Sequence, residues 1–330
     1  MPGDARHFDF EGARFGVRTW AASATPAGRQ VGLPFVLVHG FAQSARSWSR
    51  AASALADGTH ASVYALDLMG HGESDHPDGE RFYGIGFQAR AVLSFCEAVA
   101  QAEGALPVLV GYSMGGRVAL CAAERVAGAG LGGCVVERAA GATPDDLAVG
   151  HAAGDILAGD FAAKRATTGN LPGDCAVEHA DENTQGGHAS APFRALVLES
   201  AGLGPADSAD CDALAKRNVS WAARLREEGG VPFMGNWESL PLFESQKALD
   251  AETRAEVLAE RLANDANALA LTFERAGAQA MPVRSEAVRA LRMLAEAGVP
   301  AAYVAGALDA KYRAAAESLE TELGGAICTC

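Results

Sequence analysis

One short segment constrains the fold of this chain more than any other. An apolar strand pattern at 107–110 leads into Gly111-x-Ser113-x-Gly115, and a helical pattern follows at 117–125. A serine between a strand and a helix lies on a sharp turn that holds its hydroxyl clear of the sheet. Gly111 and Gly115 have no Cβ atom, so strand and helix can approach closely around the turn. We therefore predict that Ser113 is the reactive group of an enzyme.

Strand and helix patterns alternate on both sides of this turn. Strands are predicted at 14–20, 35–39, 62–68, 195–199 and 300–306, and helices at 47–55, 87–102 and 311–323. The apolar run at 35–38 is typical of a central strand that is buried on both faces. This alternation predicts an α/β protein with a mostly parallel sheet covered by helices on both faces. Together with the Gly-x-Ser-x-Gly turn, it indicates the α/β-hydrolase fold.

Two segments interrupt the alternation and divide the predicted core into 1–127, 191–206 and 284–330. Residues 128–190 are rich in Gly, Ala and Asp and contain Phe161 as their single aromatic residue. Low periodicity predicts a long low-complexity surface insertion, disordered or loosely packed, with His151, His179 and His188 as solvated loop histidines. Residues 207–283 have helical patterns at 211–228, 246–262 and 266–276, which predicts a helical cap over the active site.

The composition indicates which classes of binding partner to expect. The formal net charge of −14 repels nucleic acid and anionic lipid at long range, so neither is an expected partner. No apolar run reaches the roughly 18–20 residues of a membrane span. The first ten residues contain no apolar signal region, so we expect a cytoplasmic protein. The cysteines lack paired metal-ligand spacing, and Cys96 and Cys121 fall in apolar helical patterns typical of core residues.

Backbone donors and a carboxylate complete the predicted site. His39-Gly40-Phe41 follows the buried strand, and the N–H groups of Phe41 and Met114 would converge there on a developing oxyanion. We interpret His39 as a core histidine that braces this loop, and we expect Asp67 and His71 to stabilise the neighbouring turn. Asp309 follows the strand pattern at 300–306. It is either the acid of a catalytic triad or the N-cap of the next helix.

The histidine of such a triad has no counterpart in the sequence. Triads of this fold run in the order serine, acid, histidine, but the last histidine here is His188. Either the chain is truncated or the base has been lost. Loss of the base typically costs on the order of 10⁶ in turnover, so we expect this chain to be a poor catalyst.

Several motifs together resemble one family within the fold, the 2-succinyl-6-hydroxy-2,4-cyclohexadiene-1-carboxylate synthases (MenH) of menaquinone biosynthesis. The resemblance implies a lyase that eliminates pyruvate from a cyclohexene precursor bearing several carboxylates, with no metal or organic cofactor. It also implies that the serine acts as a base and that an oxyanion hole holds the charge on the substrate. The motifs that carry the resemblance are Val38–Phe41, Asp67–Ser74, Gly111–Arg117, Leu196–Ser200, Trp237–Phe243, Glu260-Arg261 and Ala305–Tyr312.

The charge distribution also favours a small anionic polycarboxylate as substrate. A strongly acidic chain needs local cations to hold carboxylates, and Arg117 and Arg261 could bind them in bidentate fashion. Alternatively, Arg117 is a solvated helix residue and Arg261 an i,i+4 partner on the cap surface. Tyr112 and Trp237 match substrate-pocket positions of the family, although either could be an ordinary packing residue.

Two other functions fit the same motifs. The chain could be a serine esterase of small acyl esters, because the turn and the Phe41 loop are common to many such enzymes. It could also be a catalytically inactive protein of the same fold, because the expected histidine is missing.

Overall fold

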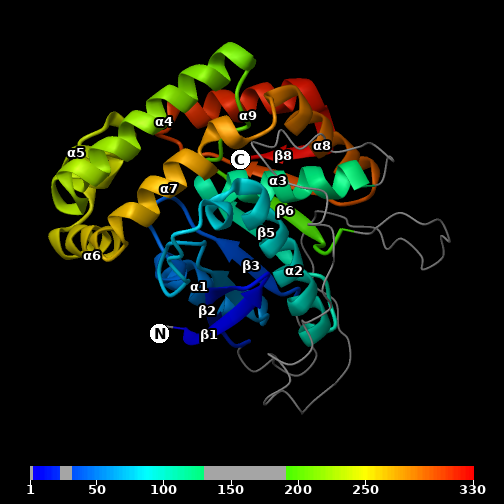
Figure 1. The fold of residues 1–330 in the computed structure, drawn as a ribbon. Coiled ribbons are helices and arrows are strands. Elements are labelled where there is room, and N and C mark those ends of the chain that lie inside the picture. Colours follow the sequence, from blue (N-terminus) through cyan, green and yellow to red (C-terminus); the bar gives the residue numbers. More distant parts are fainter. Residues whose placement is uncertain (1–2, 23–31, 130–190) are drawn as a thin grey trace.

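A central sheet of eight strands organises the computed structural model, which describes residues 3–22, 32–129 and 191–330 (Figure 1). The strand order is β1-β2-β4-β3-β5-β6-β7-β8. The pairs β1–β2 and β2–β4 are antiparallel, and every later pair is parallel. The strands are β1 (Asp4–Phe10), β2 (Ala13–Trp20), β3 (Phe35–Val38), β4 (Val63–Leu66), β5 (Val108–Tyr112), β6 (Ala195–Glu199), β7 (Ala301–Val304) and β8 (Ile327–Thr329).

Helices cover both faces of this sheet, as the alternating patterns predict. On one face, a large apolar cluster includes residues of α2 (Ile85–Glu103), α3 (Met114–Ala129), α8 (Arg284–Glu296) and α9 (Ala310–Leu323). On the other face, α1 (Ser49–Thr59) packs in a separate cluster with residues of β2, β3 and β4. Because β3 and β4 are buried on both sides, the parallel centre of the sheet is almost entirely apolar.

The cap consists of α4 (Ser208–Glu228), α5 (Gly230–Glu238), the 3-10 helix Pro241–Ala248, α6 (Ala251–Leu262) and α7 (Ala266–Ala276). These helices extend beyond one end of the sheet (Figure 1). Their apolar faces meet in a third cluster that includes Phe233, Met234 and Phe273, with Ala42 from the loop after β3. The cap is therefore packed directly against the loop that carries Phe41.

Local capping explains where the cap helices begin. The side chains of Asp207, Asp250 and Asp265 accept hydrogen bonds from the backbone N–H groups of Asp210, Thr253 and Ala268. Such caps satisfy amides that have no partner within the helix. The predicted helix 246–262 is therefore wrong in its first part. The extended backbone at Leu249 and Asp250 separates a 3-10 helix from α6.

Most other predicted elements are confirmed within a few residues, including the strand patterns at 14–20, 35–39, 195–199 and 300–306. β1, α5 and α8 are not among the elements predicted from the sequence. Cys96 and Cys121 are buried, as expected. The insertion 128–190 and its three histidines lie almost wholly outside the described residues. Within the described ranges, no helix has both the length and the apolar character needed to cross a bilayer.

Candidate active site

Ser113 lies in the turn between β5 and α3, and its backbone φ of 52° is in the left-handed region. A side chain rarely adopts this conformation, and such residues cluster at functional sites. The Ser113 N–H donates to the Glu199 carbonyl at 2.8 Å, and the Ser113 carbonyl accepts from the Arg117 N–H at 3.1 Å. These two bonds hold the turn between β6 and the first turn of α3.

The flanking glycines are required by close backbone contacts. A Cβ atom on Gly111 would lie 2.5 Å from the Gly115 carbonyl oxygen, and one on Gly115 would overlap the Val38 carbonyl group. The turn therefore packs against the end of β3, where the Phe41 loop (residues 39–45) begins. The expected close approach of strand and helix is confirmed.

The Phe41 loop brings a second amide to this end of the sheet. Met114 is buried at the start of α3, and Phe41 lies two residues after His39. Neither the Phe41 N–H nor the Met114 N–H donates to an acceptor among the described residues. Both amides are thus available to an oxygen atom of a bound molecule, which is the requirement for the predicted oxyanion hole.

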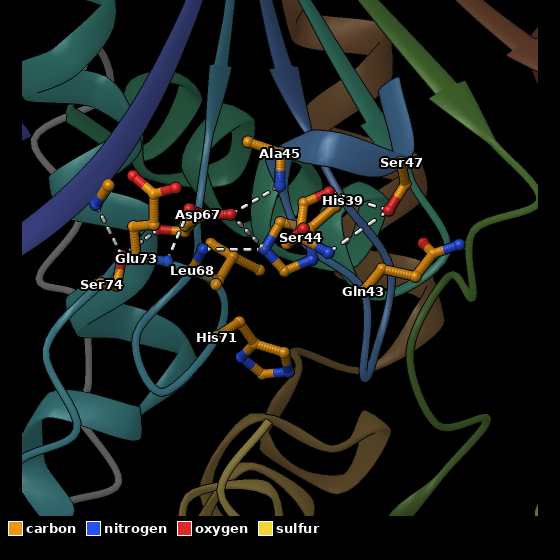
Figure 2. Close-up of polar contacts among 12 residues, drawn as sticks. His39, Gln43, Ser44, Ala45, Ser47, Asp67, Leu68, His71, Glu73 and Ser74 are labelled. Carbon is orange, nitrogen blue, oxygen red and sulfur yellow. Dashed lines mark hydrogen bonds and ion pairs between the residues drawn. The ribbon is translucent and has the colours of Figure 1, made fainter. Parts of the chain in front are cut away.

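A buried network braces the base of this loop (Figure 2). The His39 Nε2 atom accepts a hydrogen bond from the Leu68 N–H at 2.9 Å, and its Nδ1 atom lies 2.7 Å from the Gly40 carbonyl oxygen. His39 is therefore neutral, with its proton on Nδ1. Burial lowers its pKa to about 4. The interpretation of His39 as a bracing core histidine is confirmed.

Asp67 extends the same network from the end of β4. Its carboxylate accepts from the Ala45 N–H at 2.5 Å and from the Glu73 N–H at 2.9 Å, which joins the Phe41 loop to the turn after β4 (Figure 2). Burial raises the pKa of Asp67 to about 6, against the opposing effect of these two donors. The expected stabilising role of Asp67 is confirmed.

His71 lies in the turn after β4 and is fully buried. Its Nδ1 atom lies 3.0 Å from the Met69 carbonyl oxygen, and burial lowers its pKa to about 3. The ring faces those of His39 and Phe41, at centroid distances of 5.2 and 6.2 Å. His71 is thus a neutral packing residue beneath Phe41, in agreement with its expected role.

Arg117 lies on the first turn of α3, half-buried and without a carboxylate partner in the described part of the chain. Burial lowers its pKa, and the positive charge of Arg217 adds to this effect, whereas Tyr312 opposes it. The alternative of a solvated helix residue is therefore wrong. A partly buried cation beside a second cation is suited to binding an anion.

Arg261 lies on α6 and is 4% exposed, so the alternative of an i,i+4 partner on the cap surface is wrong. Its guanidinium group forms an ion pair with Glu238, donates to Gln246 at 3.0 Å and lies 4.7 Å from the centre of the Phe243 ring. These contacts hold the group in a fixed position within the cap.

Tyr112 connects the turn, the cap and the loop after β7. Burial raises its pKa, and the charges of Glu199, Arg261 and Asp309 all act on it, Arg261 in the opposite direction. Its ring also packs against the Phe41 loop, because a Cβ atom on Gly40 would lie 3.0 Å from it. The structure thus brings Asp309 and Arg261 within electrostatic reach of the residue before Ser113.

Asp309 is the N-cap of α9 and accepts a hydrogen bond from the Tyr312 N–H at 3.1 Å. The capping interpretation is therefore confirmed. The same carboxylate lies at the carboxyl end of β7, so the cap does not exclude a second role, and its role as triad acid stays a prediction.

Trp237 belongs to an aromatic cluster in the cap. Its ring lies 4.5 Å from that of Trp221 and 5.2 Å from that of Phe41 between centroids. With Trp221, Phe233 and Leu240 it lines a small hollow of about 40 Å³. Because Phe41 packs against this cluster, the cap is in direct contact with the Phe41 loop.

Glu199 and Tyr312 had no predicted role, although both belong to motifs that carry the resemblance. Glu199 ends β6 directly beside the turn, and burial raises its pKa. Tyr312 is close enough to affect both Tyr112 and Arg117. A polar residue at the end of an otherwise apolar strand, as Glu199 is, was the available signal.

Comparison with known proteins agrees with this geometry. Residues 34–161 match a family model described as the alpha/beta hydrolase fold. The structure of MenH from S. aureus aligns with a TM-score of 0.65 at 21% identity, covering 95% of this chain and 88% of that one. A thermophilic esterase from Thermogutta terrifontis aligns with a TM-score of 0.61 at 17% identity, covering 100% and 88%. The chain therefore has the α/β-hydrolase fold.

Within this fold, the chain is similar to the 2-succinyl-6-hydroxy-2,4-cyclohexadiene-1-carboxylate synthases. A protein of Citrobacter koseri with that name is 25% identical over 297 residues, which cover 88% of this chain and 84% of the relative. A shorter match, 33% identical over 93 residues, is to ethanol acetyltransferase 1 of Cyberlindnera fabianii. The chain covers only 26% of that protein's length.

Proposed function

We propose that the chain is a lyase of the menaquinone pathway, which eliminates pyruvate to give 2-succinyl-6-hydroxy-2,4-cyclohexadiene-1-carboxylate. The observation that carries the proposal is the arrangement around Ser113. A serine on a strained turn lies at the same end of the sheet as two amides and a cation, Arg117, that have no acceptor or carboxylate partner among the described residues. The similarity to the synthases over most of the chain supports the same reaction.

In this proposal the Ser113 hydroxylate removes a proton from the substrate ring. The electron pair left on the ring forms a carbon–carbon double bond as the carbon–oxygen bond to the enolpyruvyl group breaks. That group leaves as the enolate of pyruvate and takes up a proton to give pyruvate. The Phe41 and Met114 N–H groups stabilise the negative charge that spreads onto the substrate carboxylate; each such donor typically contributes roughly 3–4 kcal/mol.

Arg117 and Arg261 bind the other carboxylates of the substrate. In the part of the chain that the structure describes, Arg117 has no competing acid, whereas Arg261 is oriented by its ion pair with Glu238. Tyr112 and Trp237 form the apolar walls of the binding site. Asp309 is the triad acid in this proposal, and its carboxylate would orient a histidine.

The expected rate of pyruvate release depends on a group that accepts the proton of the Ser113 hydroxyl. Among the described histidines, none hydrogen-bonds the Ser113 hydroxyl, and His39 and His71 are buried and neutral. We therefore expect the 330-residue chain to release pyruvate slowly. A small diffusible base such as imidazole should accelerate the reaction by accepting the proton of the Ser113 hydroxyl.

The test is an assay of pyruvate release from the pathway precursor by the purified chain, with and without imidazole. Ser113→Ala is the matched control, because it removes the hydroxyl and keeps the turn. The proposal requires imidazole to increase the rate with the unmodified chain and not with Ser113→Ala. Equal rates from both proteins at every imidazole concentration would exclude Ser113 as the base.

A second candidate function is hydrolysis or transfer of small acyl groups. The local match to an ethanol acetyltransferase favours it, since that protein is more similar in sequence over its short aligned region than the synthases are. Labelling of Ser113 by a fluorophosphonate, combined with turnover of acyl esters and no pyruvate release, would support this function over the lyase.

A further inference from the structure

The end of α6 is bonded to the Phe41 loop by polar contacts between residues far apart in the sequence. Glu260 Oε1 accepts from the Ser44 N–H at 3.1 Å, from the Ser44 hydroxyl at 2.5 Å and from the Ser47 hydroxyl at 3.0 Å. Ser44 and Ser47 follow Phe41 in the chain, where the loop leads into the 3-10 helix Ala45–Trp48. A single oxygen atom of the cap thus holds the end of the loop.

Asn264, just beyond α6, makes a second connection. Its Nδ2 atom donates to the Ala42 carbonyl at 3.1 Å, and its Oδ1 atom accepts from the Gly72 N–H at 3.3 Å. The same Nδ2 atom also donates to the Glu260 carbonyl at 3.1 Å, which fixes the side chain against its own helix. Asn264 therefore joins the Phe41 loop, the turn after β4 and the cap.

These contacts lie just after the one amide of the loop that the proposed chemistry uses, that of Phe41. Phe41 precedes Ala42, whose backbone is in the left-handed region with φ of 56°, and Ser44 follows two residues later. A left-handed alanine is unfavourable by roughly 1–2 kcal/mol, so external contacts must hold it. Without the cap, the direction of the Phe41 N–H would depend on the His39 and Asp67 contacts and on the bonds between Gly40 and Gln43 within the loop.

We propose that Glu260 and Asn264 are positioning residues that hold the Phe41 N–H in its oxyanion-binding direction only when the cap is seated. This role rests on the proposed function, and it makes the loop sensitive to the position of a helix that carries the substrate-binding Arg261. Binding of a carboxylate by Arg261 and alignment of the Phe41 N–H are then coupled through about one turn of a single cap segment, from Glu260 to Asn264.

Amide hydrogen exchange tests the coupling without a substrate. The reporters are the Gln43 and Ala45 amides, which bond to Gly40 and Asp67 and not to the cap. Glu260→Ala should speed their exchange roughly tenfold or more, because the loop opens more often. Glu260→Gln should restore protection, since all three bonds end on one oxygen that an amide also supplies.

Glu256→Ala is the matched control, because Glu256 is exposed and lies one turn earlier on α6. It should leave both reporters unchanged. Asn264→Asp keeps an acceptor for the Gly72 N–H and removes the donor to the Ala42 carbonyl, so it should affect the loop but not the turn after β4. Unchanged exchange at Gln43 and Ala45 in both Glu260→Ala and Asn264→Asp would overturn the proposal.

A kinetic measurement separates positioning from simple stability. With imidazole present, Glu260→Ala should lower kcat at least tenfold with KM within about twofold, because an oxyanion donor acts in the transition state. Faster exchange with unchanged kcat would refute the positioning role. Faster exchange in a protein that releases no pyruvate at all would support the coupling and count against the proposed function alone.

Discussion

Replacement of Arg117 by methionine should make the protein more stable and weaken its affinity for dicarboxylates. The guanidinium group is partly withdrawn from water, is close to Arg217 and has no carboxylate partner in the described ranges. Folding therefore has to desolvate a cation without compensation. A methionine of similar length keeps the packing contacts of the stem and removes this cost.

The Arg117→Met substitution should therefore increase the stability of the protein and decrease its affinity for dicarboxylates. Removal of an uncompensated buried charge should raise the free energy of unfolding by about 1–2 kcal/mol. A charge-assisted hydrogen bond contributes about 1.5–3 kcal/mol to binding. Its loss therefore corresponds to an increase in Kd of roughly 10- to 150-fold.

Urea unfolding at pH 7 measures the first effect, and calorimetric titration with 2-succinylbenzoate, a stable aromatic dicarboxylate, measures the second. Arg125→Met is the matched control for binding, because Arg125 lies two turns further along α3 and makes its own contacts. It should leave Kd within about twofold. If Arg117→Met destabilises the protein and leaves Kd unchanged, Arg117 is a packing residue and the binding role is refuted.

Other substitutions and titrations test individual parts of the site. Ser113→Gly should raise the free energy of unfolding by roughly 0.5–1 kcal/mol, because the left-handed φ costs glycine nothing; urea unfolding that shows a loss would contradict the strain. Asp309→Ala should cost about 1 kcal/mol and Asp309→Asn only a few tenths, because asparagine also caps the Tyr312 N–H; equal losses in urea would argue against the cap. In NMR titrations, His39 and His71 should stay neutral from pH 8 to 5, and a transition near 6.5 in either ring would contradict their burial. Because their folded pKa values lie below the usual 6.5, these two groups should make stability fall as the pH decreases below 6.5.

The fold could be predicted from the sequence because its signals are local. The apolar run at 35–38, the alternation of strands and helices, and the glycines around Ser113 each specify structure within a few residues. The errors came where local signals conflict. The helical pattern at 246–262 contains Asp250, whose side chain starts a new helix at 251, and a capping residue within a pattern outweighs the pattern itself.

The residues of the candidate site could be predicted from the sequence better than the surroundings of their side chains. The turn, the Phe41 loop and Asp309 could be placed because the ends of parallel strands meet at one edge of the sheet. The surroundings of the two arginines could not. Arg261 is buried with Glu238 and Gln246, and Arg117 lies near Arg217, only because cap helices cross that edge. Which face of a cap helix points inward depends on packing that no sequence window contains.

The role of Glu260 also depends on packing, so it can be seen in the structure and could not be predicted from the sequence. In the sequence it is one of several glutamates on a cap helix, whereas in the structure its carboxylate bonds to Ser44, 216 positions earlier. An exposed ion pair would add little to stability, but this carboxylate satisfies a backbone amide and two hydroxyls of a loop with a left-handed residue. Glu260 bonds to uncharged groups of the loop and not to an opposite charge. It therefore fixes the geometry of the loop more than it adds to the free energy of unfolding. The cap can thus control the direction of the Phe41 amide while contributing only modestly to the stability of the fold.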